Sequence, residues 1–428
     1  MPSSITVATR TPDFDPAAGS TVNVGIDPSE ALVPDVTKFM KETAFVSIMT
    51  PLGNPFDPTC IWGAPVCYWG LPATAKSEKI EQAALEANLP YATIYPGQRQ
   101  PEDFSGVLVP TPTGVVIECL IGAVRWLNPL KRGVIFVDEM NGATRATQGA
   151  MLGFLQKRVI GDSALAPGIR ILAAANPPKW STSGFTLASP TANRMCHLQV
   201  HCPPVDEWIH HMISEEVKPQ FDAASTEDLI RAKWGAVYSH VKALFVGYMK
   251  SRPQMLHIHP NIDSAQAGYC WPSTRTWKLA ARIKATAEIL GQAETVSHTM
   301  VEGCVGEGAA ADFYIWARSA DLPTPQEVLK MNWTPDRRRL DIAFAVLTSV
   351  TQYVLSIQDK KEATEVAIGA WRLYSNFIEA SLGDMTVSAA HSLATRGLSR
   401  STDLNIRSVA DPVIRYLAEN KLLKYVPQ

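Results

Sequence analysis

A glycine-led loop that ends in lysine and serine is the first group of residues that could do chemistry. It runs from Gly70 to Ser77 (Gly-Leu-Pro-Ala-Thr-Ala-Lys-Ser), between an apolar segment and a helical pattern. The spacing is close to the phosphate-loop pattern G-x-x-x-x-G-K-[ST], with Ala75 in place of the second glycine. In such a loop, backbone N–H groups converge on phosphate oxygens at a helix N-terminus. Lys76 would reach the β- and γ-phosphates, and the Ser77 hydroxyl would bind Mg²⁺.

The residues that we expect to contact the nucleotide belong to this loop and to the first turn of the helix after it. They are Gly70, Pro72, Ala73, Thr74, Ala75, Lys76, Ser77 and Glu78. Taken alone, the relaxed match leaves an alternative open, which is a strand–turn–helix connection that contains a lysine and a serine by chance.

Two carboxylates follow a second apolar segment, Gly133–Val137. An acid at the position of Asp138 holds Mg²⁺ in P-loop NTPases, commonly through water. The next carboxylate, Glu139, can orient or deprotonate the attacking water. The alternative interpretation is an acidic helix cap, because Asp and Glu are common at helix N-termini.

Asn176 follows a third apolar segment, 171–175, and precedes two prolines. Its amide can hydrogen-bond the attacking water or the γ-phosphate, and the alternative is a turn asparagine. Ligands of open α/β sheets bind at the carboxyl ends of the strands. Three segments that end in the required groups, in the required order, therefore favour a nucleotide site.

The elements that must position these groups alternate between strands and helices. Continuous apolar runs predict buried strands, and helical patterns lie between them. The strands are expected at 65–69, 92–95, 133–137 and 170–175, and the helices at 36–48, 78–87, 114–127 and 148–156. This alternation predicts an α/β fold in which helices cover a parallel sheet.

The character of the chain changes after about residue 204, where nearly every segment has helical spacing. Helices are expected at 205–213, 226–250, 274–290, 294–318, 338–357, 361–381 and 404–422. The glycine-rich stretch 305–312 could be a helix junction, a close helix contact or a surface that rearranges. We expect an irregular arm over 1–34, a nucleotide-binding domain over 35–204, a helical lid over 205–320 and a helical C-terminal region over 321–428.

The composition of the 428 residues limits the class of protein. Apolar residues make up 46% and charged residues 19%, which is typical of a packed chain. Thirty-nine basic and 41 acidic residues give a net charge of −2, which argues against an overall basic nucleic-acid surface. We expect no membrane span, because no apolar run approaches about 18 residues. Seven scattered cysteines and the absence of a signal-peptide pattern suggest a cytoplasmic protein with reduced thiols.

The motifs together resemble the MoxR family of AAA+ ATPases. The loop is similar to the family's GxPGxAKS, in which Ala75 is usual, whereas Ala73 replaces a glycine. Residues 137–152 are similar to its DEINRAxxxxQxALL, with Gly142 where arginine is frequent. The segment 174–178 (Ala-Ala-Asn-Pro-Pro) matches the sensor-1 strand.

Two arginines take their expected roles from the same resemblance, which is strong over 60–200, fair over 270–320 and absent from 1–35. Arg194 ends a segment that matches the one carrying the arginine finger, and Arg275 stands at the start of a sensor-2 helix. An arginine stabilises the charge that develops on the γ-phosphate. The family places the finger at the neighbouring subunit's nucleotide and the sensor in the same subunit. Such a finger requires a head-to-tail homo-oligomeric ring or spiral, in this family a hexamer.

The resemblance implies an AAA+ P-loop core followed by an all-α lid and a further helical region. It also implies Mg²⁺-dependent ATP hydrolysis at subunit interfaces, used to remodel a partner protein, for example one with a von Willebrand factor A domain. Two alternatives remain. Ala73 and Gly142 keep open a nucleotide-gated scaffold with little turnover, and the near-neutral charge disfavours a nucleic-acid-dependent motor.

Overall fold

The computed structural model describes residues 33–110, 112–113, 116–181, 185–213, 218–261, 264–399, 404–420 and 422. The expected irregular arm, 1–34, lies outside the described residues except for its last two positions. None of the described helices is both long enough and apolar enough to cross a membrane.

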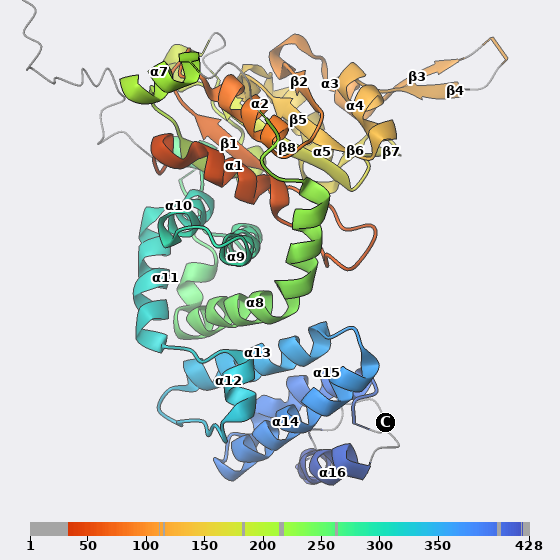
Figure 1. Cartoon of the computed structure of the whole chain (residues 1–428), viewed down its shortest axis with the longest axis vertical. Coiled ribbons are helices and arrows are strands. Elements are labelled where there is room, and N and C mark those ends of the chain that lie inside the picture. Colours follow the sequence, from red (N-terminus) through yellow and green to blue (C-terminus); the bar gives the residue numbers. More distant parts are fainter. Residues whose placement is uncertain are drawn as a thin grey trace, which may run out of the picture. The chain divides into compact units, whose positions relative to one another are not determined.

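A parallel sheet of five strands forms the core of the N-terminal half (Figure 1). Its order is β2 (Tyr91–Ile94), β5 (Arg132–Val137), β8 (Gly168–Ala175), β1 (Val66–Trp69) and β9 (Cys196–Gln199). Every neighbouring pair is parallel. The four strands expected from apolar runs are confirmed, whereas β9 was not predicted. Because β5, β8 and β1 are neighbours, their carboxyl ends meet at one edge of the sheet.

Both faces of the sheet are buried, which explains the continuous apolar runs. On β1, Val66 and Tyr68 belong to one buried cluster, whereas Cys67 and Trp69 belong to another. The covering helices include α1 (Met40–Met49), α2 (Lys76–Glu86), α3 (Pro101–Ser105), α4 (Gly122–Leu127) and α5 (Arg145–Lys157). The short α6 (Ser189–Ala192) precedes β9, and α7 (Val205–Ile213) follows it. The predicted helices over 36–48, 78–87, 148–156 and 205–213 are confirmed to within a few residues.

The expected helix over 114–127 is wrong in its first half. An antiparallel hairpin of β3 (Val107–Pro110) and β4 (Val116–Cys119) occupies this part of the chain, and helix begins only at Gly122. Residues 115–117 are Val-Val-Ile, and β-branched side chains fit a strand better than a helix. A smaller hairpin joins β6 (Val159–Ile160) to β7 (Ser163–Ala164).

The helical lid contains α8 (Ala223–Ser251), α9 (Thr274–Ile289), α10 (Glu294–Val305) and α11 (Glu307–Ala320). The single helix expected over 294–318 is divided at Gly306, whose φ of +86° suits glycine. Helix α10 packs against β9 at Gly303. A Cβ atom on Gly303 would lie 2.6 Å from the carbonyl oxygen of His197, so no side chain fits there.

The C-terminal helices have a buried core of their own. They are α12 (Pro325–Lys330), α13 (Leu340–Ser356), α14 (Lys360–Glu379), α15 (Val387–Thr395) and α16 (Leu404–Glu419). Trp371, Tyr374 and Phe377 are fully buried in this core. Helices α12 and α15 were not predicted. The predicted α/β fold, a parallel sheet flanked by helices and followed by helical regions, is confirmed, and the boundaries of the domains stay predictions.

Candidate nucleotide-binding site

The loop between β1 and α2 has the backbone shape that the sequence motif predicts. Ala73 and Ala75 have φ angles of +62° and +59°, in the left-handed region that favours glycine. An alanine in this conformation costs roughly 1–2 kcal/mol, so the surrounding fold must hold it there. At Gly70, a Cβ atom would lie 2.3 Å from the carbonyl oxygen of Val200, and only glycine fits.

The ammonium group of Lys76 is enclosed by the loop. Its Nζ donates to the carbonyl oxygens of Gly70 at 2.9 Å and Leu71 at 2.7 Å, and to Asn176 Oδ1 at 3.2 Å. The residue is 7% exposed. Burial lowers the pKa of Lys76 to about 8, although the Asp138 carboxylate acts in the opposite direction. The ammonium is therefore still mostly protonated near pH 7, and nearby phosphate charge would stabilise the charged form further.

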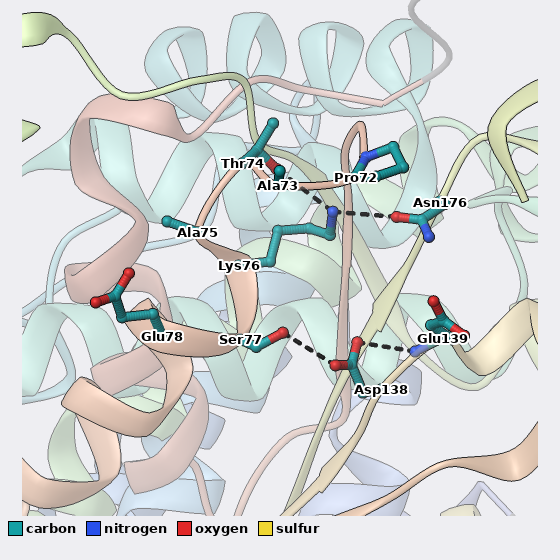
Figure 2. Close-up of a pocket in the computed structure, with 10 residues that line it drawn as sticks. All are labelled: Pro72, Ala73, Thr74, Ala75, Lys76, Ser77, Glu78, Asp138, Glu139 and Asn176. Carbon is teal, nitrogen blue, oxygen red and sulfur yellow. Dashed lines mark hydrogen bonds between the residues drawn. The ribbon is translucent and has the colours of Figure 1, made fainter.

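Ser77 and Asp138 form the expected pair of oxygen ligands. Ser77 Oγ donates to Asp138 Oδ2 at 3.0 Å, and the backbone N–H of Glu139 donates to Asp138 Oδ1 at 2.9 Å (Figure 2). A hydroxyl and a carboxylate from two neighbouring elements are hard oxygen donors of the kind that Mg²⁺ prefers. The residues therefore fit the ion that the resemblance implies.

One pocket of about 290 Å³ collects nearly all of the predicted site. Its lining consists of Pro72, Ala73, Thr74, Ala75, Lys76, Ser77, Glu78, Asp138, Glu139 and Asn176 (Figure 2). Gly70 does not line the pocket but accepts the hydrogen bond from Lys76. The volume is near the lower end of the range for small-molecule sites.

Asn141 is a residue of this site to which the sequence assigned no role. Its Nδ2 donates to the backbone carbonyl of Asn176 at 2.8 Å, and its Oδ1 accepts from the backbone N–H of Asn176 at 3.2 Å. The side chain is fully buried. These two bonds fix the end of β8 and therefore the Asn176 amide. Only its place two residues after Glu139, inside a recognised motif, could have drawn attention to it.

The two predicted arginines are near enough to interact electrostatically, and neither lines the pocket. Among the described residues, no arginine lines the pocket. Arg194 is half-buried, and its Nε donates to Gln156 Oε1 at 2.9 Å. Burial lowers the pKa of Arg194, and the nearby charge of Arg275 lowers it further. The role of Arg275 at its own subunit's nucleotide is thus a prediction that the contacts of the pocket do not support.

Buried polar side chains join the segments that carry the two arginines. Ser273 Oγ donates to Asn193 Oδ1 at 2.8 Å, and Asn193 Nδ2 donates to the carbonyl of Trp271 at 3.2 Å. Ser273 also caps α9 by accepting from the backbone N–H of Thr276. The start of the helix that carries Arg275 is therefore attached to the residue before Arg194.

Comparison with known proteins adds little to this geometry. No family model matches the sequence, and no curated protein matches it. Solved structures with a similar fold include a "putative ATPase" from Cytophaga hutchinsonii ATCC 33406. It is 17% identical, with a TM-score of 0.41, and the match covers 63% of this chain and 81% of that one. A similarity of this extent assigns no activity to the chain.

Proposed function

We propose that this protein is a Mg²⁺-dependent ATP hydrolase of the AAA+ class and of the MoxR type. The observation that carries the proposal is the convergence of Lys76, Ser77, Asp138, Glu139 and Asn176 on one pocket. These residues come from the ends of three neighbouring parallel strands and from the helix that follows the first of them. Each residue has the chemistry that one part of phosphoryl transfer needs.

Different residues of the site bind the phosphates, hold the metal ion and activate the attacking water. The left-handed loop and the N-terminus of α2 bind the phosphates through backbone N–H groups, and Lys76 supplies a positive charge at the β- and γ-phosphates. Ser77 and Asp138 would hold Mg²⁺, which neutralises charge on the phosphate oxygens when bound. Glu139 accepts the proton of the attacking water, and the Asn176 amide orients that water.

The pocket needs a guanidinium group that the described part of its own subunit does not provide. An arginine finger contributes about 10³–10⁵ in rate to phosphoryl transfer. Arg194 and Arg275 are near enough to interact electrostatically, and neither lines the pocket. We therefore assign both to the nucleotide of a neighbouring subunit, which moves Arg275 from the own-subunit role expected from the sequence. Such an arrangement requires a head-to-tail ring or spiral, for which the family suggests six subunits.

Our proposal for what ATP hydrolysis drives rests on the family resemblance. Lid movement would remodel or activate a partner protein, for which a von Willebrand factor A domain is the family's suggestion. The nucleotide-gated scaffold stays the alternative, because the glycine-like conformation of Ala73 suits nucleotide binding with or without turnover.

ATPase activity measured against protein concentration, with particle mass measured in parallel, tests the proposal. We expect specific activity to rise as the protein assembles, and Arg194→Ala to assemble with ATP without hydrolysing it. Tight ATP binding by a monomer that shows no turnover at any concentration would instead support the scaffold. Stimulation by DNA or RNA that falls with salt would support the nucleic-acid motor.

Mixing inactive variants tests the placement of the arginines. Lys76→Ala subunits cannot bind nucleotide but still present both arginines, whereas Arg194→Ala or Arg275→Ala subunits keep an intact pocket. If the arginines act on the neighbour, Lys76→Ala mixed with either arginine variant regains activity. If Arg275 acts in its own subunit, only the mixture with Arg194→Ala does so.

A further inference from the structure

Two buried ring side chains, Trp69 and His197, and the partly buried Tyr269 lie between the nucleotide loop and the arginine segments. Trp69 Nε1 donates to His197 Nδ1 at 2.9 Å, and His197 Nε2 lies 2.9 Å from the carbonyl oxygen of Ala192. Tyr269 packs on Trp69 with ring centroids 4.6 Å apart, and its ring meets His197 edge-on at 6.2 Å. Trp69 is 2% exposed and His197 is fully buried.

The hydrogen bonds define the protonation of the imidazole. An indole N–H can only donate, so His197 Nδ1 accepts, and Nε2 carries the proton that it donates to Ala192. Burial lowers the pKa of His197 to about 4, so the ring is neutral near pH 7. A neutral imidazole with this tautomer satisfies both partners at once, which a charged ring could not do.

Each member of the cluster stands next to a functional segment. Trp69 is the last residue of β1 and directly precedes Gly70 of the loop. Ala192 ends α6, two residues before Arg194. Tyr269 stands two residues before Trp271, whose carbonyl oxygen accepts from Asn193. The nucleotide loop and both arginine segments therefore meet at one imidazole.

We infer that His197 is a positioning residue that sets Arg194 and Arg275 relative to the nucleotide loop of their own subunit. The inference rests on the proposed function, in which the arginines serve the neighbouring subunit. The indole N–H of Trp69 holds the imidazole in place, and the imidazole in turn holds the backbone at Ala192, two residues before Arg194.

Trp69→Phe is the variant that tests this inference, because it removes the indole N–H and keeps an aromatic ring. We expect ATP affinity to stay within about twofold of wild type and kcat to fall on the order of 10- to 100-fold, as for a misplaced catalytic group. Trp371→Phe is the matched control. It removes an equally buried indole N–H, which bonds to the Leu398 carbonyl at 3.0 Å in the C-terminal core. We expect the Trp371→Phe variant to have the same unfolding midpoint as Trp69→Phe but the kcat of the wild-type protein.

Subunit mixing separates a positioning role from simple packing. The reference mixture of Lys76→Ala with Arg194→Ala should be active. Adding Trp69→Phe to the Lys76→Ala subunit, which donates the arginines, should abolish the recovery. Adding it to the Arg194→Ala subunit, which supplies only the pocket, should leave the recovery intact.

The possible failures are distinguishable. If the reference mixture shows no activity, the proposed trans arrangement is wrong. If the reference is active and Trp69→Phe is harmless in the donating subunit, or equally harmful in both subunits, the positioning role of His197 is overturned. His197→Gln adds a second test, because its amide can accept from Trp69 and donate to Ala192 and should recover part of the activity lost in His197→Leu.

Discussion

Ser273 donates a hydrogen bond of 2.8 Å to Asn193, and both residues are only 4% exposed. The bond joins two chain segments that are 80 residues apart, one carrying Arg194 and the other Arg275. Its burial makes it a strong constraint, because an unpaired amide oxygen at this place would be costly.

We expect Ser273→Ala to cost about 1 kcal/mol of unfolding free energy, because it removes the cap of α9. It should also lower kcat more than it changes ATP affinity, since the arginines lose a common anchor. Thr324→Ala is the control, because Thr324 caps α12 in the same way, on the surface of the C-terminal region. Equal loss of activity in the two variants would show a general effect of destabilisation.

ATP affinity should depend on pH through Lys76. The pKa of Lys76 in the folded protein is about 8, so the ammonium is fully formed only below that pH. We expect affinity to be constant up to about pH 8 and to fall by up to about tenfold per pH unit above it. Calorimetric titration between pH 6.5 and 9.5 measures this, and Lys76→Arg is the control because its guanidinium stays charged. A parallel fall in Lys76→Arg would assign the pH dependence to another group.

The lowered pKa of Lys76 also predicts how the stability of the nucleotide-free protein changes with pH. The unfolded lysine holds its proton up to about pH 10.4, well above the folded pKa. The unfolded chain therefore binds more protons between these two values, and this group's contribution to stability rises with pH over that window. Lys76→Met, which cannot titrate, should lack this rise in chemical unfolding experiments.

Glu139→Gln should retain ATP and Mg²⁺ binding and lower kcat by about 10²–10⁴, the range for a general base. Asp138→Asn should instead raise the Mg²⁺ concentration needed for half-maximal activity, because a ligand charge is lost. Single-turnover hydrolysis with a Mg²⁺ titration separates the two effects. Wild-type hydrolysis by Glu139→Gln would favour the acidic-cap interpretation of this carboxylate.

Glu227→Gln should destabilise the protein by about 3 kcal/mol, which is typical when a buried charge loses its partner. Glu227 accepts from Arg170, which is fully buried at the start of β8, and from Arg132 at 2.7 Å. Urea unfolding midpoints measure the effect. Asp228→Asn is the control, because its ion pair with Arg231 is exposed and should contribute at most about 1 kcal/mol. An unchanged midpoint for Glu227→Gln would show that the arginines find other partners.

The nucleotide pocket could be predicted from the sequence because its signals are local. Each of β1, β5 and β8 is a short apolar run. Asp138 and Asn176 follow directly after β5 and β8, and Lys76 stands at the end of the loop that follows β1. The parallel arrangement of such runs then brings Lys76, Asp138 and Asn176 to one edge.

The residues that the sequence did not reveal depend on distant partners. β9 escaped prediction because the polar residues His197 and Gln199 interrupt its apolar run, and His197 is buried only because Trp69, 128 residues away, supplies a donor. Asn141 likewise acquires its role from the backbone of Asn176. Arg275 comes near Arg194 only through the arrangement of the lid helices in space, which no local sequence pattern predicts.

The close contact at Gly303 has a mechanical consequence. A Cβ atom there would lie 2.6 Å from the carbonyl oxygen of His197 and 2.8 Å from Cys196 Sγ and Leu198 Cδ2, so α10 packs directly on β9 at this point. A lid that tilts must carry β9 with it or lose the contact. A methyl group at residue 303 should therefore force α10 and β9 apart beside His197.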